Sequence, residues 1–256
     1  ISARLKSICL RSVLRRKGRI MGAIYKREMQ SYFYTPAAYV FMGVFLALAS
    51  VFFGVGNLAA RSSNLLSFIS QLSYLWMLLS PVLTMRLIAG ERRQRTDQLL
   101  FSSPCSLSGM VLGKFFAAAT VLLCTVGATF VYALLVAMYG TLYLGETLVG
   151  YLGLILQGCA FLALDLFVSC FAKSQMTAAV LGVGANLLVW LSDVLASAVS
   201  IQAVSDALNF LSLYQRFAPF AQGQLRFSNV FFDLLFIAMT LFLSVRVLDA
   251  RRWSEA

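Results

Sequence analysis

The sequence is dominated by six long apolar runs, each of a length that crosses a lipid bilayer. A transmembrane α-helix needs about 20 consecutive, mainly apolar residues. Such runs lie at about 37–56, 68–89, 112–138, 148–171, 175–195 and 228–247. Of the 256 residues, 12% are charged, whereas a soluble domain has about a quarter of its residues charged. The sequence therefore predicts an all-α integral membrane protein with six transmembrane helices, and we interpret residues 194–226 as interfacial or re-entrant helices.

The basic residues are distributed unevenly around these six runs. If the N-terminus lies in the cytoplasm, 18 of the 21 Lys and Arg residues fall on the cytoplasmic side. The other three are Arg61, Arg216 and Arg226. Because cytoplasmic loops of membrane proteins are enriched in Lys and Arg, we expect both termini in the cytoplasm. This distribution also accounts for the net charge of +11 without a nucleic-acid partner.

Two segments precede the first apolar run. Residues 1–20 are rich in Lys and Arg and lack an apolar core of signal-peptide length. We interpret them as a basic N-terminal extension, which either lies upstream of a natural start at Met21 or rests on anionic lipid. Residues 21–36 place apolar side chains on one helix face and Lys26 on the other.

The second of these segments is predicted to be an interfacial amphipathic helix in the plane of the cytoplasmic leaflet. Pro36 then breaks the helix before the chain enters the bilayer. The helix either anchors the chain or acts as an elbow that supports a cytoplasmic partner. In the second case we expect Glu28, at the edge of the apolar face, to be a contact residue.

A short charged segment, residues 90–104, joins the second and third apolar runs. Thr96 is a good N-cap, and Asp97 lies in the first turn, where the helix dipole favours an acidic group. Residues 99–101, Leu-Leu-Phe, then form a short apolar ridge. A helix of one or two turns has nothing of its own against which to bury this ridge. The ridge therefore lies either in the lipid interface or in a groove of another protein.

The sequence predicts no catalytic, cofactor-binding or metal-binding site on this chain. The pair Gly113-Lys114 is followed by Phe115 and lacks a preceding glycine at the spacing of a phosphate-binding loop. Histidine is absent, which excludes His bases, nucleophiles and metal ligands. The five cysteines form no C-x-x-C pair, and we interpret them as small hydrophobic residues.

Four polar residues lie within or at the ends of the apolar runs: Asp165, Asn186, Asp193 and Asp233. An ionised Asp at a helix centre costs roughly 2.5–3.5 kcal/mol on insertion scales, so it should face protein or water. We expect Asp165, the deepest, either to line a pathway or to pair with a basic residue such as Arg86 or Lys173. We expect Asp193 and Asp233 to lie towards the outer interface, where water solvates them.

Three further patterns follow one another in the chain: residues 25–40 (Tyr-Lys-Arg-Glu-Met-Gln-Ser-Tyr-Phe-Tyr-Thr-Pro-Ala-Ala-Tyr-Val), 96–104 followed by 111–115, and 227–253. In this order they resemble the permease subunits of ABC-2 type transporters and, more narrowly, the gliding-motility permease family. The resemblance implies a six-helix transmembrane domain over residues 37–253, an N-terminal elbow helix and a cytoplasmic coupling helix. Arg95 stands where many members of the wider family have Gly.

The resemblance also implies partners and a set of coupling residues. The expected function is that of a permease subunit, most simply of an exporter, in the bacterial plasma (inner) membrane. Two separate ATP-binding subunits would carry ATP and Mg²⁺, and a second permease copy would complete a homodimer or a related heterodimer. The residues assigned to ATPase coupling are Glu91, Thr96, Asp97, Gln98, Leu99, Leu100, Phe101 and Pro104, together with Glu28.

Two alternative functions are left open by the residues alone. The chain would be a membrane scaffold or channel subunit if no ATPase couples to it. An intramembrane aspartyl enzyme would need Asp165 and Asp193 to share a proton. The predicted topology places these two carboxyl groups towards opposite faces of the membrane, and neither lies in a Gly-x-Gly-Asp motif.

Overall fold

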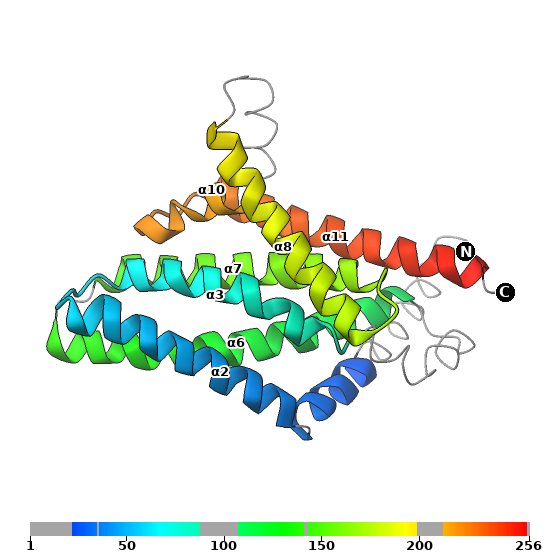
Figure 1. The fold of residues 1–256 in the computed structure, drawn as a ribbon, viewed down its shortest axis with the longest axis horizontal. Coiled ribbons are helices and arrows are strands. Elements are labelled where there is room, and N and C mark those ends of the chain that lie inside the picture. The colour runs from blue at the N-terminus through cyan, green and yellow to red at the C-terminus, as the bar shows by residue number, and fades with distance from the viewer. Residues whose placement is uncertain (1–21, 35, 88–106, 141–142, 199–211, 255–256) are drawn as a thin grey trace, which may run out of the picture.

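The protein is a bundle of long helices (Figure 1). The computed structural model describes residues 22–34, 36–87, 107–140, 143–198 and 212–254. Within these residues, six helices are long and apolar enough to cross a membrane, which confirms the six-span prediction. They are α2 (Pro36–Phe53), α3 (Leu65–Thr84), α6 (Leu107–Tyr139), α7 (Leu144–Ser169), α8 (Gln175–Ala198) and α11 (Phe227–Ser254).

Shorter elements lie between or before these helices. A helix over residues 22–34 precedes α2. A π-helix, Gly54–Ala59, follows the end of α2 directly. In the described part of the predicted interfacial stretch lie α10 (Leu213–Phe217) and a 3₁₀ turn, Phe220–Gln222. The first residues of that stretch, 194–198, belong to α8, and its residues 199–211 lie outside the described residues. Its interfacial or re-entrant position stays a prediction.

The helix boundaries differ from the predicted spans by a few residues. α6 begins at Leu107 and α11 continues to Ser254, both beyond the apolar runs that marked them. Hydropathy marks only the part of a helix that suits lipid, whereas backbone hydrogen bonding continues into polar sequence. α3 begins earlier than predicted because the Asn64 side chain caps it, accepting hydrogen bonds from the backbone N–H groups of Leu66 and Ser67.

Successive long helices run in alternating directions, so the connections collect at two ends of the bundle (Figure 1). One end holds the helix over residues 22–34, the end of α3 and the start of α6, and we call it the junction end. The far end holds the connection from α2 to α3 and the start of α7. The three basic residues predicted to be non-cytoplasmic, Arg61, Arg216 and Arg226, all belong to connections at the far end.

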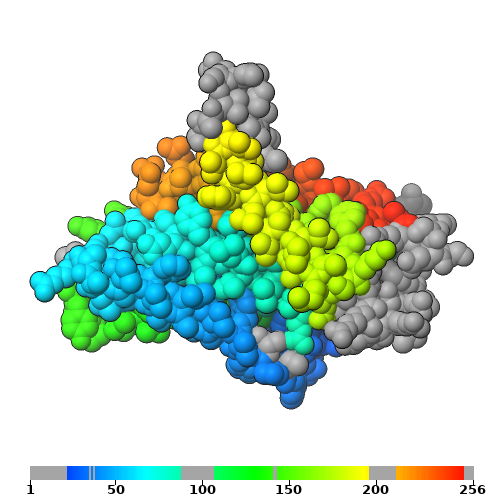
Figure 2. All heavy atoms as spheres, in the orientation of Figure 1, coloured from blue at the N-terminus to red at the C-terminus, as the bar shows by residue number. Residues whose placement is uncertain are grey.

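The centre of the bundle is α7, which contacts α3, α6, α8 and α11. Close packing there depends on small residues. A Cβ atom on Gly153 would overlap the side chain of Phe220, and one on Gly182 would lie 2.8 Å from Pro81 Cβ. Such residues let helix backbones approach closely in membranes, where apolar burial gives no preference for protein over lipid. Figure 2 shows α2, α3 and α8 forming one outer face, on which many apolar side chains are exposed.

Candidate functional site

The predicted coupling segment lies outside the described residues. Glu91, Thr96, Asp97, Gln98, Leu99, Leu100, Phe101 and Pro104 all fall within residues 88–106, so their coupling role stays a prediction. The structure does describe the two points at which this segment joins the bundle. One is the turn after α3, which reaches Leu87, and the other is the start of α6 at Leu107.

The helix over residues 22–34 packs its apolar face against the bundle at this place. Tyr32 and Glu28 are buried, while Ile24 and Tyr25 are half-buried and pack on the core. Lys26 lies on the opposite, exposed side. The helix is therefore amphipathic as predicted, although its apolar face covers protein. Its role as an elbow stays a prediction.

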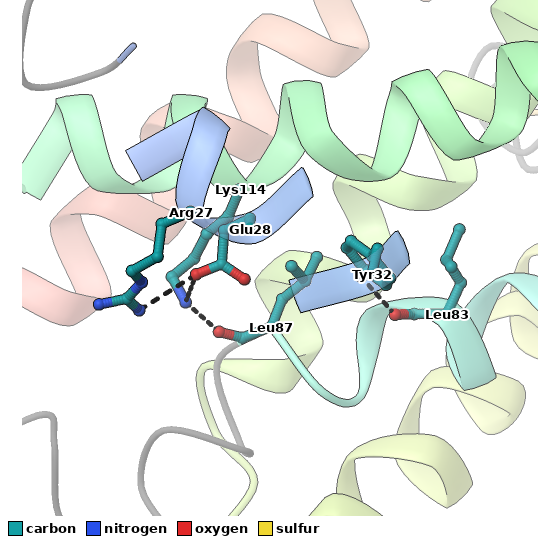
Figure 3. A network of polar contacts seen from close by, with 6 residues as sticks. All are labelled: Arg27, Glu28, Tyr32, Leu83, Leu87 and Lys114. Carbon is teal, nitrogen blue, oxygen red and sulfur yellow. Dashed lines mark hydrogen bonds and ion pairs between the residues drawn. The ribbon is translucent and has the colours of Figure 1, made fainter. Parts of the chain in front are cut away.

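Lys114, on the second turn of α6, is the centre of a buried polar network (Figure 3). Only 1% of its side chain is exposed. Its Nζ atom donates a hydrogen bond to the carbonyl oxygen of Leu87 and lies 3.6 Å from Glu28 Oε1. The same carboxylate oxygen accepts a hydrogen bond of 3.2 Å from the exposed Arg27. A buried ammonium group needs such partners, because burial without them costs several kcal/mol.

Tyr32 ties the same helix to α3. One turn after Glu28, its hydroxyl donates a hydrogen bond of 2.9 Å to the carbonyl oxygen of Leu83 (Figure 3). Burial raises the pKa of Tyr32 above its ordinary value, and the negative charge of Glu28 adds to this effect. The hydroxyl therefore stays protonated and remains a donor. A second tyrosine, Tyr25, shares a hydrogen bond of 3.0 Å with Thr120 of α6.

We call Glu28, Tyr32, Leu83, Leu87 and Lys114 the junction. It joins three elements that are distant in the sequence, and it brackets residues 88–106 from both sides. A displacement of that segment would act on α3 and α6 together, because both are attached to one helix. The sequence marks Glu28 as a candidate, but it offers no signal for its pairing with Lys114 beyond a single lysine at the start of an apolar run.

A second group of polar side chains lies between α3, α7 and α8. We call Ser73, Ser80, Gln157, Asp165 and Asn186 the polar seam, and all five are buried. Ser73 donates a hydrogen bond of 2.5 Å to Gln157 Oε1, and Ser80 donates one of 2.6 Å to Asp165 Oδ2. Hydrogen bonds of this kind join transmembrane helices, since lipid offers polar groups no alternative partner.

Asn186 connects α8 to the polar seam. Its Nδ2 group donates to the carbonyl oxygen of Met77 at 3.0 Å and to Ser80 Oγ at 3.2 Å. The partner of Asp165 is thus the hydroxyl of Ser80, which Asn186 in turn contacts. The predicted pairing of Asp165 with Arg86 or Lys173 is wrong, because neither residue forms an ion pair with it in the structure.

The other two acidic residues lie near the far end. Asp193 is partly exposed and accepts a hydrogen bond of 3.3 Å from the backbone N–H of Tyr214. Asp233 is buried, with only 4% of its surface exposed, so the prediction that water solvates it is wrong. Its neighbours on α11 contact α10: Asn229 donates a hydrogen bond to the backbone carbonyl of Arg216, and the Arg216 guanidinium stacks on Phe232. Asp165 and Asp193 have separate partners, which is not the arrangement of a shared-proton dyad.

Among the described residues, no three His, Cys, Asp or Glu side chains come together as metal ligands do. The comparisons identify the class of protein instead. Residues 21–248 match the model of the family described as ABC-2 family transporter protein, and a comparison with curated proteins finds no significant match. Because this match covers most of the chain, the protein belongs to the ABC-2 transporter family.

Membership in this family defines the chain as a multi-pass membrane component of a transporter. Such a component is not itself catalytic, and the family in general works with an ABC ATP-binding partner. The six apolar helices are the permease part of such an assembly.

Proposed function

We propose that this protein is the permease subunit of an exporter and that a separate ATP-binding subunit drives it through the junction end. The observation that carries the proposal is the buried contact of Lys114 with Glu28 and Leu87. It fixes one helix to both helices that flank residues 88–106. That segment contains the apolar ridge at residues 99–101, which we propose as the docking element.

Docking at this place has a mechanical consequence. When two ATP-binding subunits close around ATP and Mg²⁺, they would push on the coupling segment and on the exposed side of the helix over residues 22–34. The junction would pass that displacement to α3 and α6. Such a push shifts the protein between two states only if the partner makes different contacts in each state.

The remaining parts of the proposed assembly follow from the family and from the surface of the bundle. A second permease copy would form a homodimer or a related heterodimer, and the apolar outer faces of α2, α8 and α11 offer it contact area. The narrower likeness to gliding-motility permeases, and with it export and a bacterial plasma (inner) membrane location, rests on the three sequence segments described above.

Docking can be tested by co-purification with a candidate ABC ATP-binding subunit from the same organism. Replacing Leu99→Asp and Leu100→Asp together should abolish the association, because carboxylates cannot fill an apolar groove. A matched control carries Leu144→Asp and Leu225→Asp, two exposed leucines at the far end. This control should retain the association, and both variants should insert into membranes normally.

Three results would contradict the proposal. If the variant with both coupling leucines replaced still binds the ATP-binding subunit, the docking assignment is wrong. If the unaltered protein binds no ATP-binding subunit at all, a scaffold or channel function is favoured instead. Nucleotide hydrolysis by the purified permease alone would also exclude a separate motor.

A further inference from the structure

A cavity of about 400 Å³ lies at the far end, between the end of α2 and the end of α6. Phe53, Leu135 and Val136 form an apolar wall, and Asn57 and Arg61 contribute polar groups. This volume falls within the range of about 300–1,000 Å³ that is typical of ligand sites. The left end of the bundle in Figure 1 shows the elements that enclose it.

The backbone beside the cavity is irregular in two independent ways. The π-helix Gly54–Ala59 follows α2 directly, and such π segments occur frequently at functional sites. Arg61 then has a φ of 49°, the only positive φ at a non-glycine residue in the described ranges. Residues in this region of backbone space persist only where the surroundings hold them.

The side chain of Asn57 stabilises this backbone conformation. Its side chain is buried, and its Nδ2 group donates hydrogen bonds to the carbonyl oxygens of Ser62 at 3.0 Å and Asn64 at 3.2 Å. These two bonds close the turn around Arg61. The fold therefore fixes the position from which the Arg61 side chain extends at the rim of the cavity.

The charge at this rim is not neutralised within the described part of the chain. No carboxylate forms an ion pair with Arg61 there, and none lines the cavity. Guanidinium groups bind phosphates well, through paired and charge-assisted hydrogen bonds. The cavity thus combines an apolar wall at the edge of a membrane bundle with one cation where the transmembrane helices end.

We propose that this cavity binds an anionic glycerophospholipid of the surrounding bilayer. One acyl chain lies against the wall formed by Phe53, Leu135 and Val136, and the phosphate pairs with Arg61. The occupant is a membrane lipid because the site complements both parts of one. The apolar wall fits an acyl chain, and the cation lies where the helices end, which is where a bilayer places lipid phosphates. This site is separate from the junction, and it goes beyond the proposed coupling function.

The test is native mass spectrometry of the purified full chain in detergent, with lipids of matched acyl chains. The probes are dioleoyl phosphatidylglycerol, dioleoyl phosphatidylcholine and dioleoylglycerol, which differ in headgroup charge and in the presence of phosphate. The unaltered protein should prefer phosphatidylglycerol and retain dioleoylglycerol least. Arg61→Gln should weaken phosphatidylglycerol binding by about five- to tenfold.

Matched variants separate this site from non-specific lipid binding. Arg226→Gln removes an exposed arginine at the same end and should leave binding unchanged. Leu135→Trp fills the cavity and should reduce binding of both phospholipids, whereas Leu134→Trp, on the same helix but outside the cavity, should not. Circular dichroism should show that all four variants keep their helical content.

Three results would overturn the proposal. Equal phosphatidylglycerol binding by the unaltered protein and by Arg61→Gln would remove the phosphate contact. Dioleoylglycerol binding as tightly as phosphatidylglycerol would do the same. If Leu135→Trp disrupts a dimer while no lipid is retained by the unaltered protein, the cavity is an interface between two copies. None of these results depends on whether an ATP-binding subunit docks.

Discussion

Glu28 and Asp165 are both buried carboxyl groups, but their surroundings differ in charge. In the junction, Glu28 lies beside Lys114 and Arg27. In the polar seam, Asp165 accepts a hydrogen bond from the hydroxyl of Ser80, and no cation of the described residues pairs with it. The junction thus holds a charged pair where the helices leave the apolar region, whereas the polar seam uses neutral donors within it. Neutral hydrogen bonds avoid most of the desolvation cost of an ion pair.

The largest expected effect on the free energy of unfolding concerns the ion pair in the junction. Lys114→Met should lower the free energy of unfolding by about 3–5 kcal/mol, because it removes the buried one of the two cations beside the Glu28 carboxylate and leaves the Leu87 carbonyl oxygen without its donor. Denaturant titration in detergent micelles measures this loss.

A rescue variant serves as the control for that loss. Adding Glu28→Gln to Lys114→Met removes the carboxylate charge that has lost its buried cation, and it should recover part of the lost stability. If the double variant is no more stable than Lys114→Met alone, the loss comes from packing and the ion pair is not its cause.

The next effect tests how closely α8 must approach the polar seam. Gly182→Ala should cost about 1–3 kcal/mol, because its Cβ atom would lie 2.8 Å from Pro81 Cβ and 3.2 Å from Asp165 Oδ1. Gly184→Ala, two residues further along α8, meets no atom within 4 Å and should be neutral or slightly stabilising. Equal unfolding free energies for the two variants would contradict this packing argument.

A smaller effect isolates the neutral contact within the junction. Tyr32→Phe should cost about 1 kcal/mol, since it removes the hydrogen bond to Leu83 and leaves that carbonyl oxygen without its donor. Thermal unfolding of the purified protein measures the change. Tyr34→Phe is the control, because the side chain of Tyr34 is exposed on the same helix.

The smallest effect sharpens the contrast between the two carboxyl groups. Asp165→Asn keeps the shape of the side chain and an acceptor for Ser80, so it should change the free energy of unfolding by less than about 1 kcal/mol. Glu28→Gln, the same chemical change in the junction, should cost more because it removes a negative charge from beside the buried Lys114. If Asp165→Asn proves the more damaging, the polar seam holds a functional charge.

The fold was largely predictable from the sequence, but the candidate site was predictable only in part. Apolar length alone predicts six spans, and the pattern from Ile24 to Phe33 predicts an amphipathic helix, because both are local properties of the chain. The position of Glu28 on that helix was also predictable. Its partner was not, since no periodicity links it to Lys114. Asp165 likewise gave no signal that a serine on α3 would be its partner.

The sequence by itself determined how many helices cross the membrane and how the basic residues divide between the two ends. These properties depend on the solvation of each segment, which is additive along the chain. Only the tertiary structure decided which groups lie together: Lys114 with Glu28, Ser80 with Asp165, and Arg61 with the apolar wall of the cavity. The physical reason is that such contacts depend on helix rotation and close approach, which small residues such as Gly182 permit.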